Sequence, residues 1–181
     1  MNIAGIDYES VNDGEGVRTV IYVSGCSHNC YNCHNPKTHD INYGVPFTEE
    51  LQNEIIENIK KRHFLSGITW SGGDPLHENN LDDVLRFTNK IRLLMPEKNI
   101  WLYTGYQWEH IMKYEHGNFY INNFNVDALR QAVVSQCDVI VDGRYIDSQR
   151  DITLQFRGSA NQRVIDVKES FKQNKVTLYC E

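Results

Sequence analysis

The stretch RTVIYVSGCSHNCYNCHN, residues 18–35, is the part of the sequence that decides its fold. It begins with an apolar run over 18–24, which is typical of a short buried strand, and Gly25 ends that run. Three cysteines, Cys26, Cys30 and Cys33, then lie within eight residues. The sequence therefore predicts a buried strand that leads directly into a loop of thiols.

The apolar pattern changes period repeatedly along the rest of the chain. Strands are predicted at 18–24, 68–71, 99–103 and 138–142, and helices at 49–62, 80–94 and about 127–136. No element is assigned to the polar, aromatic segment 106–125. This alternation predicts an α/β fold with a parallel sheet and crossover helices, either open or curved as a partial barrel. Further strands at 164–167 and 175–179 could close one edge, and residues 1–181 are expected to form a single domain.

Unusual residues follow each predicted parallel strand. The cysteine loop follows the first, Gly72-Gly73-Asp74-Pro75 the second, Thr104-Gly105-Tyr106 the third and Asp142-Gly143-Arg144 the fourth. Ligands of parallel sheets bind where the carboxyl ends of the strands emerge. The four loops are therefore expected to share one site.

The spacing of the cysteines allows one tight loop to direct three thiolates to one point. Soft thiolates select iron–sulfur clusters, zinc or cuprous copper, and a cubane cluster held by three cysteines keeps one iron open. A zinc site that uses the three cysteines and His28, His34 or His39 is the alternative. Structural zinc sites usually consist of two separate halves, whereas Cys137 and Cys180 are single.

Composition narrows the class of protein. The chain has 181 residues, 40% hydrophobic and 23% charged, with a net charge of −6. This balance disfavours nucleic-acid binding, which needs dense basic charge. No apolar run approaches the roughly 20 residues that span a bilayer, and the beginning MNIAGIDYES is unlike a signal peptide. A cytoplasmic protein without membrane contact is expected.

An ordered set of motifs resembles a known family. Cys-x3-Cys-x2-Cys after the first strand resembles the radical S-adenosylmethionine enzymes. The segments at 13–18 (DGEGVR), 33–35 (CHN), 103–106 (YTGY), 138–145 (DVIVDGRY) and 157–163 (RGSANQR) resemble the glycyl-radical-enzyme activases, above all those of anaerobic ribonucleoside-triphosphate reductase. These motifs run from residue 5 to about 168, and the resemblance implies a compact partial (βα) barrel.

The resemblance also implies cofactors, a reaction and partners. Cys26, Cys30 and Cys33 hold a [4Fe–4S] cluster, and S-adenosylmethionine binds its open iron. Reductive cleavage of S-adenosylmethionine yields a 5′-deoxyadenosyl radical, which takes a hydrogen atom from a glycine of the reductase. Flavodoxin is the implied electron donor. No acid–base pair or triad stands out at a convincing spacing, so no catalytic residue is expected beyond the cluster ligands.

Candidate cofactor-binding residues flank the cysteines and follow later strands. The resemblance implies that Gly72, Gly73 and Asp74 bind the methionine amino group, although the pattern alone also fits a simple turn. Asn32, Cys33 and His34 are implied to contact the adenine and the cluster edge; a surface position is the other reading of His34.

Asp142 is a further candidate, for a cation or for polar atoms of the cofactor, and a turn residue before Gly143 is its alternative. Related activases have another acid at the end of the preceding strand, where this chain has Tyr103.

Two other functions remain open from sequence. The chain could activate a different glycyl radical enzyme, such as pyruvate formate-lyase, or it could be a zinc-stabilised interaction module.

Overall fold

The computed structural model of the chain describes residues 1–112 and 124–180. The strands are β1 (Asn2–Ser10), β2 (Arg18–Val23), β3 (Val45–Pro46), β4 (Gly67–Gly72), β5 (Asn99–Tyr103), β6 (Val139–Asp142), β7 (Arg163–Asp166) and β8 (Leu178–Cys180). The α-helices are α1 (Glu49–Lys61), α2 (Leu81–Leu94), α3 (Trp108–Ile111), α4 (Phe124–Ser135) and α5 (Val167–Gln173). Two short 3-10 helices span Pro36–His39 and Asp147–Gln149.

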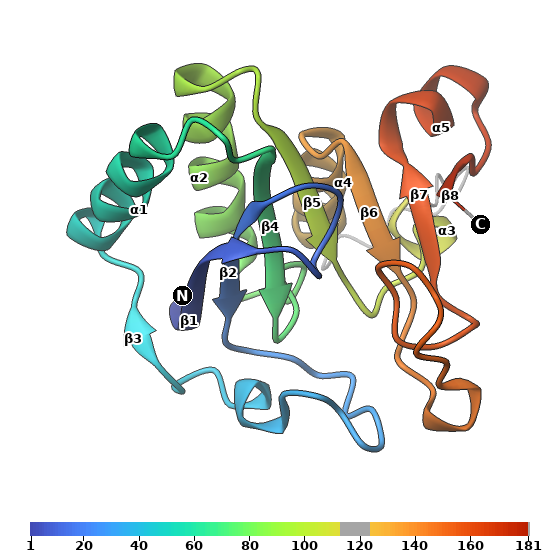
Figure 1. The fold of residues 1–181 in the computed structure, drawn as a ribbon. Coiled ribbons are helices and arrows are strands. Elements are labelled where there is room, and N and C mark those ends of the chain that lie inside the picture. The colour runs from blue at the N-terminus through green and yellow to red at the C-terminus, as the bar shows by residue number, and fades with distance from the viewer. Residues whose placement is uncertain (113–123, 181) are drawn as a thin grey trace.

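All eight strands form one sheet in the order β3-β1-β2-β4-β5-β6-β7-β8 (Figure 1). The central strands β2, β4, β5 and β6 pair in parallel, and α1, α2 and α4 lie in the connections between them. The pairs toward both edges are antiparallel. The mixed α/β class is therefore confirmed, including the parallel centre with crossover helices. Within the described residues no ladder joins β3 to β8, so the sheet is open and barrel closure is not observed.

The two faces of the sheet bury different side chains. Ile21, Trp70 and Leu102 point to the face that packs on the helices and belong to the main core. Trp101 and Val141 point to the opposite face, in a smaller cluster. This alternation along single strands explains why both tryptophans of the strands are buried, as their positions predict.

The first helix begins and ends close to its predicted limits. The hydroxyl of Thr48 accepts a hydrogen bond from the Leu51 amide at 3.3 Å and so caps the amino end of α1. Ile55 and Ile59 are fully buried against the sheet, while Leu51 is partly buried. The buried face of α1 thus follows the four-residue spacing of these side chains.

Several elements were missed or misplaced by the sequence pattern, among them the two-residue strand β3. β1 was not predicted, because among its nine residues only Ile3 and Ser10 are buried and no apolar alternation results. The predicted strand 164–167 ends one residue earlier, since the Asp166 side chain accepts from the Glu169 amide and starts α5. Because α5 extends to Gln173, the last strand begins at Leu178 rather than at residue 175. In the unassigned segment 106–125, α3 is present and α4 begins, whereas 113–123 lie outside the described residues.

A buried arginine links the beginnings of three neighbouring strands. The Arg18 side chain is fully buried and donates to Thr69 Oγ1 at 2.8 Å, Asn99 Oδ1 at 2.6 Å and the Ile68 carbonyl at 2.6 Å. Its guanidinium also lies over the Trp101 ring, 5.3 Å from the centroid. Burial lowers the pKa of Arg18 to about 10. Since every contact is to a neutral group or a ring, Arg18 aligns β2, β4 and β5 by geometry rather than by a direct ion pair.

Asp138 provides a test of how β6 is held in the sheet. Burial alone would raise the pKa of Asp138, but hydrogen bonds from Lys168, Arg92 and the Ile100 amide hold it below its ordinary value. Asp138→Asn is expected to lower the free energy of unfolding by about 2 kcal/mol at neutral pH, because hydrogen bonds to a charged group are the stronger ones.

The pH dependence of this loss follows from the lowered pKa. A lowered folded-state pKa contributes stability above the unfolded value of about 4 and loses it as the pH falls. The difference between wild type and Asp138→Asn, measured by denaturant unfolding, should therefore shrink from pH 6 to pH 3. A difference that grows on acidification would contradict this assignment.

Within residues 1–112 and 124–180, no helix is long and apolar enough to cross a bilayer.

Candidate functional site

The cysteine loop leaves the sheet directly after β2. Gly25 has a φ of 101°, and its amide donates to the Thr38 carbonyl at 2.8 Å, so the short helix at 36–39 returns to the start of the loop. Asn29 and Asn32 adopt positive φ values of 48° and 52°, which asparagine tolerates better than most residues. These turns fold the twelve residues between β2 and Pro36 into a compact loop.

The three cysteines of this loop are chemically available. Cys26, Cys30 and Cys33 are half-buried and form no disulfide. Burial raises the pKa of Cys26 to about 11; the His28 amide opposes that shift, while Asp74, Cys30 and Cys33 add to it. A thiol in such surroundings becomes a thiolate only when a nearby cation stabilises it, as a bound metal does.

The donor set fits an iron–sulfur cluster better than zinc. Among the described residues no three His, Cys, Asp or Glu side chains are already gathered in a metal-binding arrangement. His28, one of the three possible fourth zinc ligands, already uses both ring nitrogens, toward Asp74 and Arg144. His34 is exposed, whereas His39 Nε2 is buried with no partner in the described chain. Three thiols in one loop suit a cluster that keeps one iron open, whereas zinc would need His34 or His39 as its fourth ligand.

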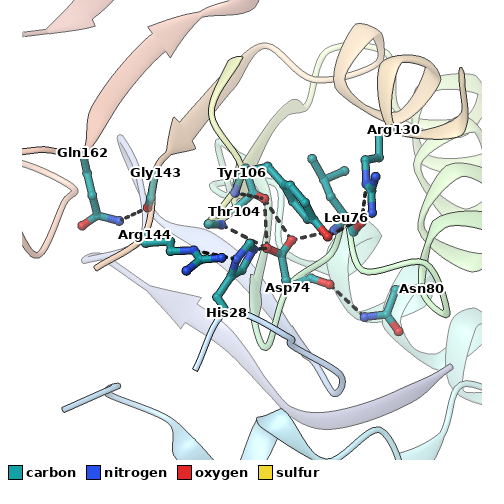
Figure 2. A network of polar contacts seen from close by, with 11 residues as sticks. His28, Asp74, Leu76, Asn80, Thr104, Tyr106, Arg130, Gly143, Arg144 and Gln162 are labelled. Atoms are coloured by element: carbon teal, nitrogen blue, oxygen red, sulfur yellow. Dashed lines mark hydrogen bonds and ion pairs between the residues drawn. The ribbon is translucent and has the colours of Figure 1, made fainter. Parts of the chain in front are cut away.

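The loops after the four parallel strands meet, as the sequence predicts (Figure 2). Asp74, after β4, is 1% exposed and lies at their centre. Its carboxylate accepts from His28 Nε2 at 2.7 Å, from the Thr104 hydroxyl at 2.9 Å and from the Gly105 amide at 3.0 Å. Arg144, after β6, donates from Nε to His28 Nδ1 at 3.2 Å. One buried carboxylate thus joins the cysteine loop to the loops after β4 and β5, and His28 extends the contact to the loop after β6.

The paired glycines after β4 have a packing role of their own. Gly72 has a φ of 102°, and a Cβ there would lie 2.7 Å from the Val23 backbone. A Cβ at Gly73 would lie 2.6 Å from the Gly25 carbonyl oxygen. The missing side chains therefore let the loop after β4 approach the end of β2 and the cysteine loop.

Asp142 at the end of β6 is buried and fully engaged. Its carboxylate accepts from the Trp108 amide at 2.8 Å and from Arg163 at 2.5 Å. Arg163 also pairs with Glu109, at 2.8 Å. In this structure Asp142 therefore fastens α3 and β7 to the end of β6. Its predicted contact with a cation or cofactor stays a prediction.

A pocket of about 530 Å³ opens beside this network. Its polar lining includes His28, Tyr106, His110, Arg130, Arg144 and Asn161. Of these, Arg130 pairs with Asp127 at 2.9 Å and lies over the Tyr106 ring, 4.3 Å from the centroid. Two arginines, Arg130 and Arg144, lie in this lining and could pair with an anionic group of a ligand.

Asn32 and His34 are exposed on the cysteine loop, away from the buried network. The sequence analysis did not select Thr104 and Arg144 as binding residues, and it named His28 only as an alternative zinc ligand. Only their place in the sequence could have indicated a role in the site, because each lies in a loop at the carboxyl end of a parallel strand. Their partners come from distant parts of the chain, and nothing in the local pattern specifies them.

Comparisons with known proteins agree with this geometry. A family model described as a 4Fe-4S single cluster domain matches residues 12–165. A relative from Haemophilus influenzae, named anaerobic ribonucleoside-triphosphate reductase-activating protein, is 36% identical over 83% of this chain and 88% of its own length. Relatives of the same name from Escherichia coli and Vibrio cholerae are 36% and 37% identical, over 84% and 83% of this chain and 90% and 88% of their own lengths.

The matched region extends from before β2 into β7 and so contains the cysteine loop and the three loops that meet it. The chain belongs to the family of anaerobic ribonucleoside-triphosphate reductase-activating proteins.

Proposed function

We propose that this chain activates anaerobic ribonucleoside-triphosphate reductase by installing a glycyl radical on it, with an iron–sulfur cluster and S-adenosylmethionine as cofactors. The observation that carries the proposal is the junction of three free thiols with the loops after β4, β5 and β6, in a chain of this family. The finer fold proposed with it is a partial (βα) barrel, in one domain that includes residues 1–181.

Cys26, Cys30 and Cys33 would hold three irons of a [4Fe–4S] cluster. When bound and reduced, the cluster supplies one electron to S-adenosylmethionine, which splits into methionine and the 5′-deoxyadenosyl radical that takes hydrogen from the glycine. The protein itself would bind and orient these cofactors and exclude water from them.

The chain's own residues would position the cofactor from two sides. We propose that the segment Gly72, Gly73 and Asp74 binds the methionine amino group, through the backbone at the two glycines. Asn32, Cys33 and His34 are proposed to approach the adenine and the cluster edge from the cysteine loop, and Asp142 to contact a cation or polar atoms of the cofactor.

The remaining partners follow from the same reading. A reduced flavodoxin or a similar protein is the proposed electron donor. The net charge of −6 supports the proposal that the protein acts without nucleic acid. A location in the cytoplasm, without membrane contact, is proposed with it.

A partner-dependent radical measurement tests the proposal. Reduced, cluster-loaded protein and S-adenosylmethionine are mixed anaerobically with the anaerobic reductase and, separately, with pyruvate formate-lyase. We expect a glycyl radical signal by electron paramagnetic resonance on the reductase alone, because the matched relatives carry that activity in their name. A signal only on pyruvate formate-lyase would overturn the assignment of the partner.

A further inference from the structure

His28 lies between two of the proposed cluster ligands, Cys26 and Cys30, yet its side chain points away from solvent. It is 9% exposed, and its ring packs edge-to-face on Tyr106 with centroids 4.7 Å apart and planes at 73°. A Cβ on Gly105 would lie 2.3 Å from the imidazole Cδ2, so only glycine permits this contact. The imidazole is therefore enclosed by the loop after β5.

The hydrogen bonds of His28 specify its tautomer. Arg144 Nε carries a hydrogen and can only donate, so His28 Nδ1 accepts from it at 3.2 Å. The ring proton is then on Nε2 and is donated to Asp74 Oδ2 at 2.7 Å. Arg144, His28 and Asp74 thus form one directed chain of hydrogen bonds between the loops after β6, β2 and β4 (Figure 2).

Asp74 cannot shift without disturbing its other contacts. Its carboxylate also accepts from the Leu76 amide at 2.8 Å and from Thr104 and Gly105, all fixed by the loops after β4 and β5. His28 is consequently held by a rigid group on one side and an arginine on the other. His28 thus connects the cysteine loop to Asp74 and Arg144 by hydrogen bonds of its side chain.

We propose that His28 is a positioning residue that fixes the cysteine loop against the cofactor-binding loops, and so sets the orientation of the cluster relative to S-adenosylmethionine. This inference rests on the proposed function. Both ring nitrogens of His28 are engaged within the protein, by Asp74 and Arg144, so its removal should leave cluster binding intact and impair only the alignment of the two cofactors.

Two substitutions separate the two hydrogen bonds of the imidazole. His28→Ala removes both, whereas His28→Gln retains a donor near the Nε2 position, toward Asp74, and loses the acceptor for Arg144. Ser27→Ala, at an exposed position of the same loop, is the matched control. Each protein is loaded anaerobically and compared for iron and sulfide content, for the resonance spectrum of the reduced cluster with saturating S-adenosylmethionine, and for formation of 5′-deoxyadenosine.

We expect all three variants to hold iron and sulfide as wild type does. His28→Ala should change the spectrum recorded with S-adenosylmethionine. It should also lower kcat for cleavage about 100-fold, with a smaller change in KM, because a displacement of the reacting groups by about 1 Å lowers a rate by about that factor. The kcat of His28→Gln should fall about tenfold, which corresponds to the loss of about one hydrogen bond. Ser27→Ala should match wild type in every measurement.

Two results would overturn the inference. One is a His28→Ala protein with the wild-type spectrum and cleavage rate. The other is loss of iron and sulfide from both His28 variants, which would make the residue part of cluster binding. If the wild-type protein itself cleaves no S-adenosylmethionine, the proposed function fails and this inference fails with it; an active wild type with unaffected variants overturns the inference alone.

Discussion

A Cys30→Ala protein is expected to retain its fold, to lose the complete [4Fe–4S] cluster and to cleave no S-adenosylmethionine. Cys30 is half-buried on a loop outside the sheet, so the substitution removes little core packing. Two remaining thiols cannot hold three irons of a cubane, and the described residues offer no nearby cysteine as a replacement. Iron and sulfide analysis, the absorption of the cluster and 5′-deoxyadenosine formation measure the loss.

Cys180→Ala is the matched control, since Cys180 is also a half-buried free thiol but lies on β8 at the edge of the sheet. It should keep both cluster and cleavage. Cleavage retained by Cys30→Ala would contradict the cluster assignment. Wild-type protein purified without oxygen that holds stoichiometric zinc, with neither iron nor sulfide, would favour the zinc-stabilised module instead.

Asp74→Ala is expected to lower the free energy of unfolding of the apoprotein by about 3–5 kcal/mol, because it strips several buried donors of their acceptor. The Leu76 amide, the Gly105 amide and His28 Nε2 all lose their partner together. The same substitution should abolish cofactor cleavage, since the loops after β2, β4 and β5 lose their common contact. Denaturant unfolding measures the first effect, and 5′-deoxyadenosine formation the second.

Asp74→Asn sharpens this test because it retains the volume of the side chain. One carboxylate oxygen of Asp74 accepts from the Leu76 amide and the other from the Gly105 amide, so an asparagine NH2 must face one of these fixed donors. A loss of about 2 kcal/mol is therefore expected. Glu78→Ala removes the same charge from an exposed position of the same loop and should change stability by less than about 0.5 kcal/mol. Equal stability of Asp74→Asn and Glu78→Ala would show that the network is not needed for folding.

The fold could be predicted wherever burial follows a regular period. β5 occupies the predicted range 99–103 because its apolar residues form a short continuous run that is buried on both faces. α1 and α2 agree with their predicted ranges within one residue, because their apolar side chains recur every three to four positions. β1 escaped prediction because its backbone pairs with β2 while few of its side chains are buried. Backbone pairing has no side-chain signature, so such a strand is recognisable only next to its partner.

The candidate site could be predicted as a set of loops but not as a network. Parallel strands direct their carboxyl ends to one edge, which is why the loops after β2, β4, β5 and β6 were expected together and are found together. The sequence also identified Asp74, though as a cofactor contact rather than as the centre of four loops. The importance of His28 depends on Arg144, 116 residues away, and no local pattern specifies that pair.

The sequence by itself determined the three thiols, the open position that their number implies, and the order of strands and helices that carries them to one edge of a sheet. Only the tertiary structure decided which buried groups align that edge: Asp74 at its centre, His28 as the link from the cysteine loop, and Arg144 beyond it. The reason is physical. Periodic burial and ligand chemistry depend on neighbouring residues, whereas the orientation of a buried polar side chain depends on donors and acceptors that only the folded chain brings within hydrogen-bonding distance.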